Sequence, residues 1–373
     1  MRVCIDVQSA ISQLAGVGRY TKLLVQNLGQ VAGDNILVLF YFDFLHKGAP
    51  FNVPGVTHKA IRWCPGRLVQ AAWKTTGWPP FDFFAGAANV YHFPNFILPP
   101  LSRGKSVVTI HDMSFLRFPQ FAEEKNLRYL TAKIGDTVNR ADAVITDSQF
   151  SADEIKSLLK VDSSKIFAIH PGVSADFGAP PQQQIQRTLS EFNLDRPYIL
   201  TVGTLEPRKN IEFLIEVFER LSGFDGYLVL AGMHGWKCEA IIERIKNSSC
   251  ASRIKMLGHV DDSKLPSLYA GAELFVITSL YEGFGFPPLE AMACGTPVVS
   301  STGGSLPEVL GNGAALVDGF DAEKWVSKIR NALTDSNARR RLQETGSAQA
   351  AKYQWVETAR KTWDVYKKVL TGA

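Results

Sequence analysis

The feature that most constrains the fold is the alternation of short apolar runs with amphipathic stretches along the whole chain. Most of the apolar runs are continuous, which suits parallel strands that are covered on both faces. Helix-periodic stretches such as 209–221 and 321–334 lie between them. This order predicts doubly wound α/β folding with right-handed crossovers. The predicted strands are 2–7, 36–42, 106–112, 143–148, 165–172, 198–203, 227–232, 253–258, 274–278 and 297–301.

The strand-like runs fall into two groups, which are separated by residues 173–187. This stretch is rich in Pro, Gln, Ala and Gly and has no apolar period, so we interpret it as a linker. A chain of 373 residues also exceeds one ordinary domain. We therefore predict two α/β domains, 1–178 and 190–352, with a cleft between them. The apolar stripe of 354–370 predicts a terminal helix that needs a partner surface, on its own domain or on the first.

Composition and charge argue against several classes of protein. A net charge of +4 does not fit a polycation that coats nucleic acid. No apolar run approaches the roughly 20 residues that span a bilayer, and the N-terminus reads as a buried strand rather than a signal peptide. The five cysteines are scattered without a CxxC pair, which argues against a disulfide framework and a zinc site. These features favour a reducing cytosol.

The surplus of positive charge lies in the first half of the chain, and 51–105 is its most basic segment. Basic side chains beside interfacial aromatics favour an anionic membrane surface or an anionic acceptor. The alternative is a solvated loop whose tryptophans plug the core. Against Asp82 alone, the segment holds Lys59, Arg62, Arg67, Lys74, Arg103 and Lys105, interleaved with Trp63, Trp73 and Trp78.

Two candidate site motifs lie in the first domain. Gly16 and Gly18 precede an apolar-periodic helix, and a helix N-terminus with accessible amides favours phosphate. The alternative is a flexible turn, because the spacing is not GxGxxG. His111 and Asp112 end a predicted strand, and a polar pair at the carboxyl end of a parallel strand points toward the cleft. A lone histidine at such a position is more often structural.

A cationic motif, GTLEPRKN, begins at Gly203, where a predicted strand of the second domain ends. Arg208 and Lys209 stand side by side there, at a strand-to-helix junction where cations are poorly placed to be buried. Two fixed cations that face a helix end are suited to hold a diphosphate. The alternative is a solvated basic pair.

The most specific stretch is 279–292 (SLYEGFGFPPLEAM), in which Glu282 and Glu290 lie eight residues apart. Gly283 and Gly285 permit close approach of the backbone. The prolines that follow suit the first turn of a helix, and the Gly-Thr-Pro beyond ends it. We predict a short helix that aims its N-terminal amides at an anion, with Glu290 able to accept from a vicinal diol such as a ribose. The alternative is a surface loop with two solvated acids.

Together these motifs resemble those of the retaining glycosyltransferases of family 4, which have the two-domain GT-B fold, and the resemblance covers nearly the whole chain. It implies an acceptor-binding domain at 1–178, a nucleotide-sugar-binding domain at 190–352, and a helix at 354–373 that crosses back to the first. The cation pair would then hold the donor diphosphate, and the two glutamates would contact the transferred sugar and the ribose. The expected residues are His111, Arg208, Lys209 and Glu282 for catalysis, Gly16, Gly18, Gly203, Gly283, Phe284, Gly285, Leu289 and Glu290 for the donor, and Asp112, Arg62 and Trp73 for the acceptor.

The expected chemistry follows from the charge that develops on the leaving group. Breaking a sugar–phosphate bond leaves negative charge on the diphosphate, which fixed cations stabilise. No DxD-like acid pair stands in a loop suited to a metal, so we predict transfer without a metal or a cofactor. The resemblance implies retention of configuration by a route in which the leaving phosphate takes the acceptor proton. The residues leave open whether a covalent intermediate forms instead.

Three other functions stay open at this point. A nucleotide-sugar epimerase or hydrolase could share the two-domain architecture. A dinucleotide-dependent dehydrogenase also uses doubly wound sheets, but no GxGxxG follows a strand and no acid lies at the ribose spacing about 20 residues on. A non-enzymatic nucleotide-binding module would leave the convergence of His111, Arg208 and Glu282 unexplained.

The residues alone do not give the donor base, the sugar, the acceptor or the oligomeric state. The EPRKN and YEGFGFPPLEAM stretches are similar to those of bacterial polysaccharide mannosyltransferases. This similarity implies GDP-mannose as donor and a saccharide or lipid-linked saccharide as acceptor, in the synthesis of a surface polysaccharide such as lipopolysaccharide. It also implies a cytoplasmic protein, peripheral at the inner face of the membrane, with no nucleic-acid partner.

Overall fold

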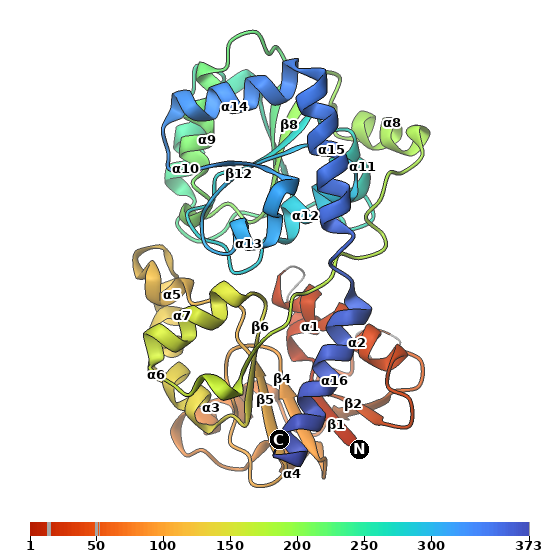
Figure 1. Cartoon of the computed structure of the whole chain (residues 1–373). Helices are drawn as coiled ribbons and strands as arrows, with labels where there is room; N and C mark the ends of the chain where they lie inside the picture. Colours follow the sequence, from red (N-terminus) through yellow and green to blue (C-terminus); the bar gives the residue numbers. More distant parts are fainter. Residues whose placement is uncertain (13–15, 49–50, 52, 373) are drawn as a thin grey trace. The chain divides into compact units, whose positions relative to one another are not determined.

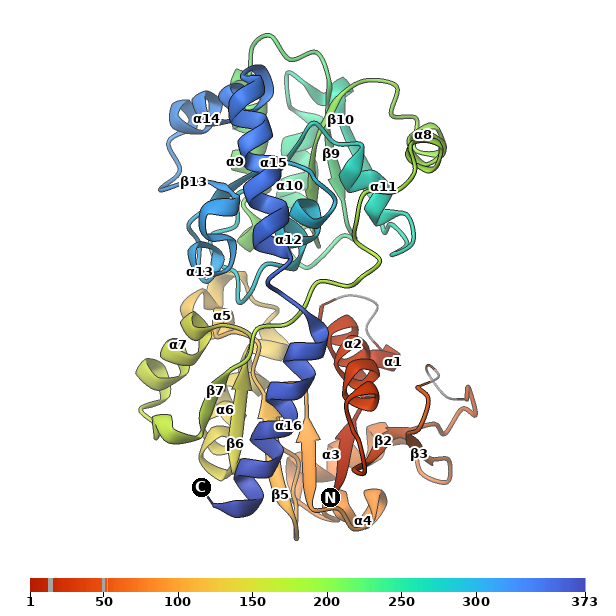
Figure 2. The ribbon, with the colours of Figure 1, turned by 45° about the vertical axis from the view of Figure 1, so that its right-hand side comes forward.

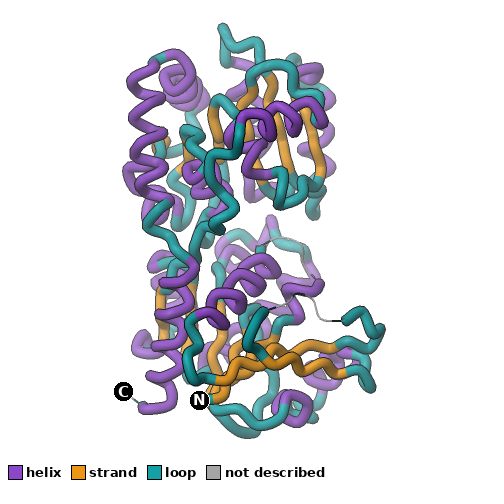
Figure 3. Tube along the Cα trace, turned by 90° about the vertical axis from the view of Figure 1, so that its right-hand side faces the viewer, coloured by secondary structure: helices purple, strands orange, loops and turns teal. Residues whose placement is uncertain are grey.

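Within residues 1–12, 16–48, 51 and 53–372, which the computed structural model describes, two wholly parallel β-sheets organise the chain (Figure 1). Each sheet belongs to its own unit, with helices beside its strands (Figure 3). The predicted class, two doubly wound α/β domains, is confirmed. Unit 1 comprises residues 1–116, 124–172 and 354–373, and unit 2 comprises 117–123 and 173–353.

The sheet of unit 1 has the strand order β3-β2-β1-β4-β5-β6-β7. Cys4 of β1 pairs with Val38 of β2 on one side and with Tyr91 of β4 on the other. These central strands are buried, because their apolar runs are covered on both faces. The strands are β1 (Arg2–Asp6), β2 (Ile36–Phe42), β3 (Thr57–Ile61), β4 (Val90–Phe93), β5 (Lys105–Thr109), β6 (Ala143–Thr146) and β7 (Ile166–Ala168).

The sheet of unit 2 has the strand order β10-β9-β8-β11-β12-β13. Alternate residues of one strand enter different hydrophobic clusters: Leu200 packs with Val229, whereas Ile199 packs with Leu228. This alternation explains why the strand sequences are apolar throughout. The strands are β8 (Tyr198–Val202), β9 (Tyr227–Ala231), β10 (Ile254–Gly258), β11 (Leu274–Ile277), β12 (Val298–Ser301) and β13 (Ala315–Val317).

Helices connect the strands in both units, as the crossovers of parallel sheets require. Short 3₁₀ turns accompany them at 119–121, 163–165, 207–209, 251–253 and 311–313. The helices before residue 160 are α1 (Gln8–Ser12), α2 (Val17–Gln30), α3 (Gly66–Thr75), α4 (Phe81–Ala85), α5 (Ser114–Arg117), α6 (Glu124–Arg140) and α7 (Gln149–Leu159). The later helices are α8 (Gln182–Glu191), α9 (Ile211–Arg220), α10 (Glu239–Lys246), α11 (Leu265–Ala270), α12 (Phe286–Ala293), α13 (Leu306–Leu310), α14 (Ala322–Thr334), α15 (Ser336–Ala350) and α16 (Trp355–Thr371).

Each predicted strand is present: β2 has the predicted bounds, β5 begins one residue earlier and ends sooner than predicted, and the others are shorter than predicted. The strands β3, β4 and β13 were not predicted. β3 is an edge strand that carries His58 and Lys59, so it lacks an apolar run. The four residues of β4 include His92, and β13 spans only three residues.

The interpretation of 173–187 as a linker is wrong in its second half. Residues from Gln182 onward form α8. Its sequence is mostly polar, and only Ile185 and Thr188 are buried. Ile185 and Leu189 lie close to Gly271, where a β-carbon would come within 3.2 Å and 3.1 Å of their side chains. This contact with the end of α11 stabilises α8, a helix that the polar composition of its sequence did not predict.

The terminal helix α16 belongs to unit 1, which confirms that it returns to the first domain. It runs alongside α2 (Figure 2), and the Trp363 indole donates to the carbonyl of Leu28 at 3.2 Å. The Tyr366 hydroxyl is 2.7 Å from Nδ1 of His92 in β4, and His92 Nε2 is 2.8 Å from the Thr109 hydroxyl in β5. Four members of the predicted apolar stripe, Trp355, Ala359, Trp363 and Tyr366, are therefore buried as their spacing predicts, whereas the fifth, Leu370, is exposed.

Candidate active site

In each sheet the strand order reverses once, between β1 and β4 in unit 1 and between β8 and β11 in unit 2. Ligands of doubly wound folds bind outside the carboxyl ends of the strands at such a reversal. In unit 2, Arg208 and Lys209 follow β8 and Glu282 follows β11. The cation pair and the first glutamate therefore stand at the reversal point of that sheet.

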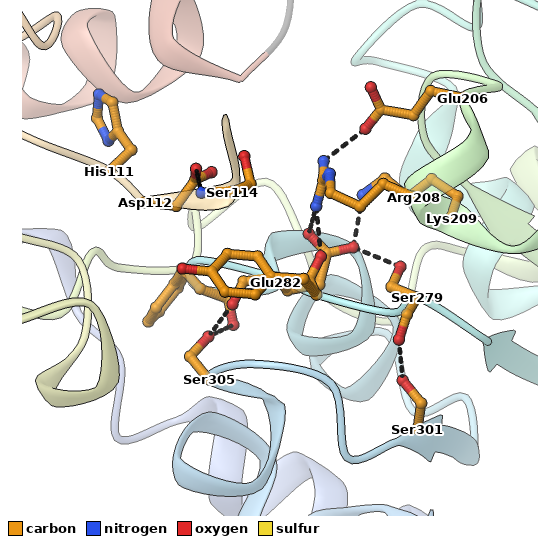
Figure 4. A network of polar contacts seen from close by, with 12 residues as sticks. His111, Asp112, Ser114, Glu206, Arg208, Lys209, Ser279, Glu282, Ser301 and Ser305 are labelled. Atoms are coloured by element: carbon orange, nitrogen blue, oxygen red, sulfur yellow. Dashed lines mark hydrogen bonds and ion pairs between the residues drawn. The ribbon is translucent and has the colours of Figure 1, made fainter. Parts of the chain in front are cut away.

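The structure joins Arg208, Lys209 and Glu282 in one ion-paired network (Figure 4). Lys209 Nζ donates to Glu282 Oε1 at 2.6 Å, and Arg208 Nη1 donates to Glu282 Oε2 at 3.0 Å. Arg208 Nη1 also donates to the carbonyl of Tyr281 at 2.5 Å. The cationic side chains are only 18% and 14% exposed. They are thus fixed near-buried charges and not a solvated pair.

Glu206 and Ser279 complete this network, and the sequence did not single them out. Glu206 Oε1 accepts from Arg208 Nη2 at 2.5 Å, and the Ser279 hydroxyl donates to Glu282 Oε1 at 2.6 Å. Glu206 precedes the cation pair in EPRKN, and Ser279 precedes Glu282 by three residues. Both residues could have been proposed as site residues, because each lies within a motif that the sequence analysis had identified. Two carboxylates balance two cations here, so a diphosphate oxygen would compete with carboxylates for the same N–H donors.

The charge state of Glu282 follows from its neighbours. Burial alone would raise its pKa, but Lys209 and Arg208 outweigh burial and lower the pKa of Glu282 to about 2. The carboxylate is therefore ionised at any physiological pH and holds both cations in place. Gly203 contributes backbone geometry: its φ of +148° favours glycine, and a β-carbon there would stand 3.5 Å from Lys209 Cε.

The backbone at 282–284 is held by the loop after β12. The amide and hydroxyl of Ser305 both donate to the carbonyl of Glu282, at 2.9 Å and 3.1 Å, and the hydroxyl is also 3.1 Å from the carbonyl of Phe284. A β-carbon on Gly304 would come within 2.3 Å of the Glu282 carbonyl oxygen. The Gly-Gly-Ser after β12 was a readable signal that the sequence interpretation missed.

The predicted short helix after this loop is confirmed as α12. Gly285 is its N-cap, with φ +106°, and a β-carbon there would come within 2.9 Å of Leu306. Leu289 is fully buried. Glu290 is also buried, and its Oε2 accepts from the Tyr269 hydroxyl of α11 at 3.0 Å. The second glutamate is therefore anchored apart from the ion-paired network of the first.

In unit 1, the glycine-bearing loop leads into α2 as predicted. Gly16 is the N-cap, with φ +58° and ψ −117°, a conformation that favours glycine. Nothing lies within 4 Å of a β-carbon there, so conformation and not space requires glycine. Gly18 is buried in the first turn of α2. Ala15, which directly precedes Gly16, lies outside the described residues.

His111 lies beyond the end of β5 and is paired with Asp147, which the sequence did not single out. Its Nδ1 is 2.7 Å from Asp147 Oδ2, and its Nε2 is 3.2 Å from the carbonyl of Pro94. Asp112 has a local role, since its Oδ1 accepts from the amide of Ser114 at 2.8 Å.

The expected acceptor residues Arg62 and Trp73 are engaged within unit 1. Arg62 forms an ion pair with Asp43 at 3.2 Å. The Trp73 indole donates to the carbonyl of Pro79 at 2.6 Å, and its ring packs near Phe81 and Phe84. Trp73 is thus half-buried against core aromatics, which is near what the alternative interpretation of the segment expects.

The rest of the segment is not a solvated loop, because β3, α3, α4 and β4 fold within it. Its other two tryptophans, Trp63 and Trp78, are exposed. The interpretation as a loop is therefore wrong, and of its three tryptophans Trp73 is half-buried while the other two are exposed.

Two further findings concern the described residues alone. No three His, Cys, Asp or Glu side chains among them are grouped so that they could hold a metal ion. None of the helices in this part of the chain has the length and apolarity needed to cross a membrane.

The chain is similar in sequence to known glycosyltransferases. Residues 14–177 match the family model described as Glycosyltransferase Family 4, and 182–349 match that of Glycosyl transferases group 1. The O-antigen chain mannosyltransferase B of Escherichia coli is 30% identical, over 98% of this chain and 100% of that protein. The serotype-specific mannosyltransferase WbdA of Escherichia coli is 32% identical over the whole chain, which spans 49% of that longer relative.

Solved structures show the same fold at low identity. Sucrose-phosphate synthase from Thermosynechococcus elongatus has a TM-score of 0.79 at 19% identity, and both chains are covered fully. Anabaena HepE in complex with UDP-glucose has a TM-score of 0.74 at 18% identity, over 99% of this chain and 100% of that one. With two family models in sequence and a full-length relative, the chain belongs to the family 4 and group 1 glycosyltransferases.

Proposed function

We propose that this glycosyltransferase moves mannose from GDP-mannose to a saccharide or lipid-linked saccharide acceptor in the synthesis of a surface polysaccharide. The support for mannose is that relatives at 30% and 32% identity bear the names of mannosyltransferases. The support for a nucleotide-sugar donor is the cationic network at the reversal point of the unit 2 sheet.

The observation that carries the proposal is the pair of nearly buried cations held by Glu282. As the bond between sugar and phosphate breaks, negative charge grows on the diphosphate. Cations that are already oriented stabilise that charge without reorganising at the moment of reaction. Arg208 and Lys209 take this role, and Glu282 keeps both oriented until the diphosphate competes for their N–H groups. Glu290 then accepts from the ribose of the donor.

We further propose that transfer proceeds with retention and without a metal. Two fixed cations supply the charge that a metal would otherwise bring to the diphosphate. The carboxylate of Glu282 is fully engaged by Lys209, Arg208 and Ser279, which disfavours it as a nucleophile and favours a route in which the leaving phosphate takes the acceptor proton.

A donor panel tests the proposal. Thermal unfolding would be followed with GDP, UDP and ADP at equal concentration, because the nucleotide that binds the folded state most tightly raises the midpoint most. We expect the largest rise with GDP, and transfer of labelled mannose from GDP-mannose to a lipid-linked acceptor with the anomeric configuration kept. A larger rise with UDP, together with sugar transfer from a UDP-sugar, would overturn the choice of donor.

We also propose that the protein associates with an anionic membrane through what we call the α3–α4 surface: Trp63, Arg67, Leu68, Lys74, Trp78 and Phe83. The apolar members are exposed to 65%, 65%, 68% and 61%, in chain order. They flank a buried aromatic cluster, since Trp63 stacks on Phe84 at 5.6 Å and Phe83 packs on the same ring at 5.1 Å. Exposed tryptophans with basic neighbours suit a headgroup region, where a lipid-linked acceptor would be found.

A further inference from the structure

The pair formed by His111 and Asp147 offers an inference that goes beyond the proposed donor and acceptor. Both residues follow neighbouring strands of the unit 1 sheet, β5 and β6, and both are buried. The His111 ring lies against Tyr20 of α2 at 4.7 Å and against Phe96 at 5.5 Å, both edge-on. The imidazole is therefore fixed in orientation by packing as well as by its hydrogen bonds.

The hydrogen-bond partners determine where the protons of this pair lie. Nδ1 faces a carboxylate oxygen of Asp147, and Nε2 faces the carbonyl oxygen of Pro94. A carbonyl can only accept, so Nε2 must carry a proton. A second proton lies between Nδ1 and Oδ2 of Asp147. A histidine that acts as a catalytic base and is paired with Asp through Nδ1 has an unprotonated Nε2. In this structure, a lone pair on Nε2 would face a lone pair of the Pro94 carbonyl oxygen.

The second oxygen of Asp147 leaves His111 as the hydrogen-bond partner recorded for this carboxylate. Asp147 Oδ1 is buried and has no hydrogen-bond partner among the described residues. A buried carboxylate oxygen without a partner is costly for the fold. The negative charge of Asp147 is directed at His111 by proximity, and it is the largest favourable influence on the imidazolium.

Several titratable groups face this pair. Tyr20 approaches from α2, His92 from β4, Asp112 follows in the chain, and His170 lies beyond β7. Burial disfavours the charged imidazole, but the Asp147 carboxylate outweighs burial and raises the pKa of His111 above its ordinary value. His92 is neutral, because burial lowers its pKa to about 3, so it leaves the positive charge on His111.

We propose that Asp147 is a positioning residue that keeps His111 as a hydrogen-bond donor at Nε2, so that His111 donates to an oxygen of the sugar substrate and takes no proton during transfer. The proposal rests on the proposed glycosyl transfer for its substrate. On binding, a substrate oxygen replaces the Pro94 carbonyl as the acceptor of the Nε2 proton. His111 is then no general base, and the acceptor proton passes to the leaving phosphate, as in the route proposed above.

The sign of the pH dependence tests the proposal. If His111 is a donor, kcat/KM falls as pH rises through the raised pKa of His111, whereas a base would lose activity as pH falls. Asp147→Asn keeps an acceptor for Nδ1 and removes the charge. In Asp147→Asn, we expect the fall of kcat/KM with rising pH to occur roughly one to three pH units lower than in the wild type. Asp153→Asn, which alters an exposed acid of α7, is the matched control and should leave this pH dependence unchanged.

A spectroscopic readout does not depend on activity. Nitrogen-15 spectra of the full-length wild type across pH, with His111→Gln to identify the resonances, report whether both ring nitrogens carry protons. We expect both to be protonated at neutral pH and one to be lost at lower pH in Asp147→Asn. A neutral His111 at pH 7 in the wild type, or an unchanged pH dependence in Asp147→Asn, would overturn the proposal. If the wild type transfers no sugar, the proposed function fails, while these spectra still decide the state of the pair.

Discussion

At the scale of single residues, the cation pair is the feature on which turnover depends. Lys209→Ala removes one of the two charges that offset the leaving diphosphate. We expect turnover to fall at least about a hundredfold, the effect typical of losing one transition-state contact. Steady-state kinetics with saturating donor measures it. Lys328→Ala, an exposed lysine of α14, is the control, and near-normal turnover in Lys209→Ala would refute the clamp.

Glu290 is expected to affect donor binding more than the chemical step. Glu290→Gln weakens acceptance from the ribose, and a hydrogen bond to a charged group contributes about 1.5–3 kcal/mol. The donor KM should therefore rise by roughly one to two orders of magnitude with a smaller change in kcat. Tyr269→Phe removes the structural partner of Glu290 but keeps its carboxylate. If Tyr269→Phe raises the donor KM as much as Glu290→Gln does, the ribose role is wrong.

Local sequence predicted individual site residues better than their pairings. Arg208 and Glu282 were each found within a motif, but their ion pair joins residues 74 positions apart. The pairing of His111 with Asp147 was accessible in principle, since both follow neighbouring parallel strands and such strands end at the same edge. The sequence analysis missed this pairing because Asp147 lies outside every motif that was identified.

At the scale of elements, α16 is held to the unit 1 sheet by a buried polar contact. Burial, with a smaller contribution from His111, lowers the pKa of His92 to about 3. Unfolded histidine binds a proton near pH 6.5, so the unfolded state binds more protons between pH 6.5 and about 3. The free energy of unfolding should therefore fall as pH falls through this window. Urea unfolding at pH 7 and pH 5 should show a flatter dependence for His92→Gln.

The hydroxyl that His92 contacts can be removed separately. Tyr366→Phe deletes the partner of Nδ1 while keeping the buried ring. We expect a loss of about 1 kcal/mol in the free energy of unfolding at pH 7, measured by urea unfolding. A variant as stable as the wild type would show that the contact adds nothing to the anchoring of α16.

The α3–α4 surface makes a prediction that separates binding from stability. Trp63→Ser with Trp78→Ser should reduce sedimentation with vesicles of anionic lipid several-fold, because both rings are exposed and available to the headgroup region. The midpoint of thermal unfolding should change little, since neither ring fills the core. Phe320→Ser, at an exposed aromatic of unit 2, is the control. Equal binding by the double variant and the wild type would contradict the membrane proposal.

At the scale of the whole molecule, the pattern of the sequence predicted the two-sheet architecture because both faces of each sheet are covered. Strands with continuous apolar runs were found, whereas the polar edge strand β3 was not. The helix α8 was mistaken for linker because two buried side chains suffice to hold it. The apolar stripe of α16 alone could not predict that this helix packs on unit 1. Such a stripe indicates that the helix needs a partner surface, but it does not identify that surface.

Metal dependence is also a property of the whole enzyme. If the cation pair supplies the charge at the diphosphate, dialysis against a chelator should leave the rate of sugar transfer within about twofold of the untreated rate. The assay would be run in metal-free buffer, with and without added Mn²⁺ and Mg²⁺. Activity that is abolished by chelation and restored by either ion would contradict this prediction.

The position of α16 has a consequence for biosynthesis. Unit 1 includes α16, which is synthesised only after all the described strands of unit 2. Until then, Leu28 of α2 and His92 of β4 lack their partners Trp363 and Tyr366. Unit 1 therefore lacks α16 during most of translation. We expect chaperones to bind the nascent chain in that state.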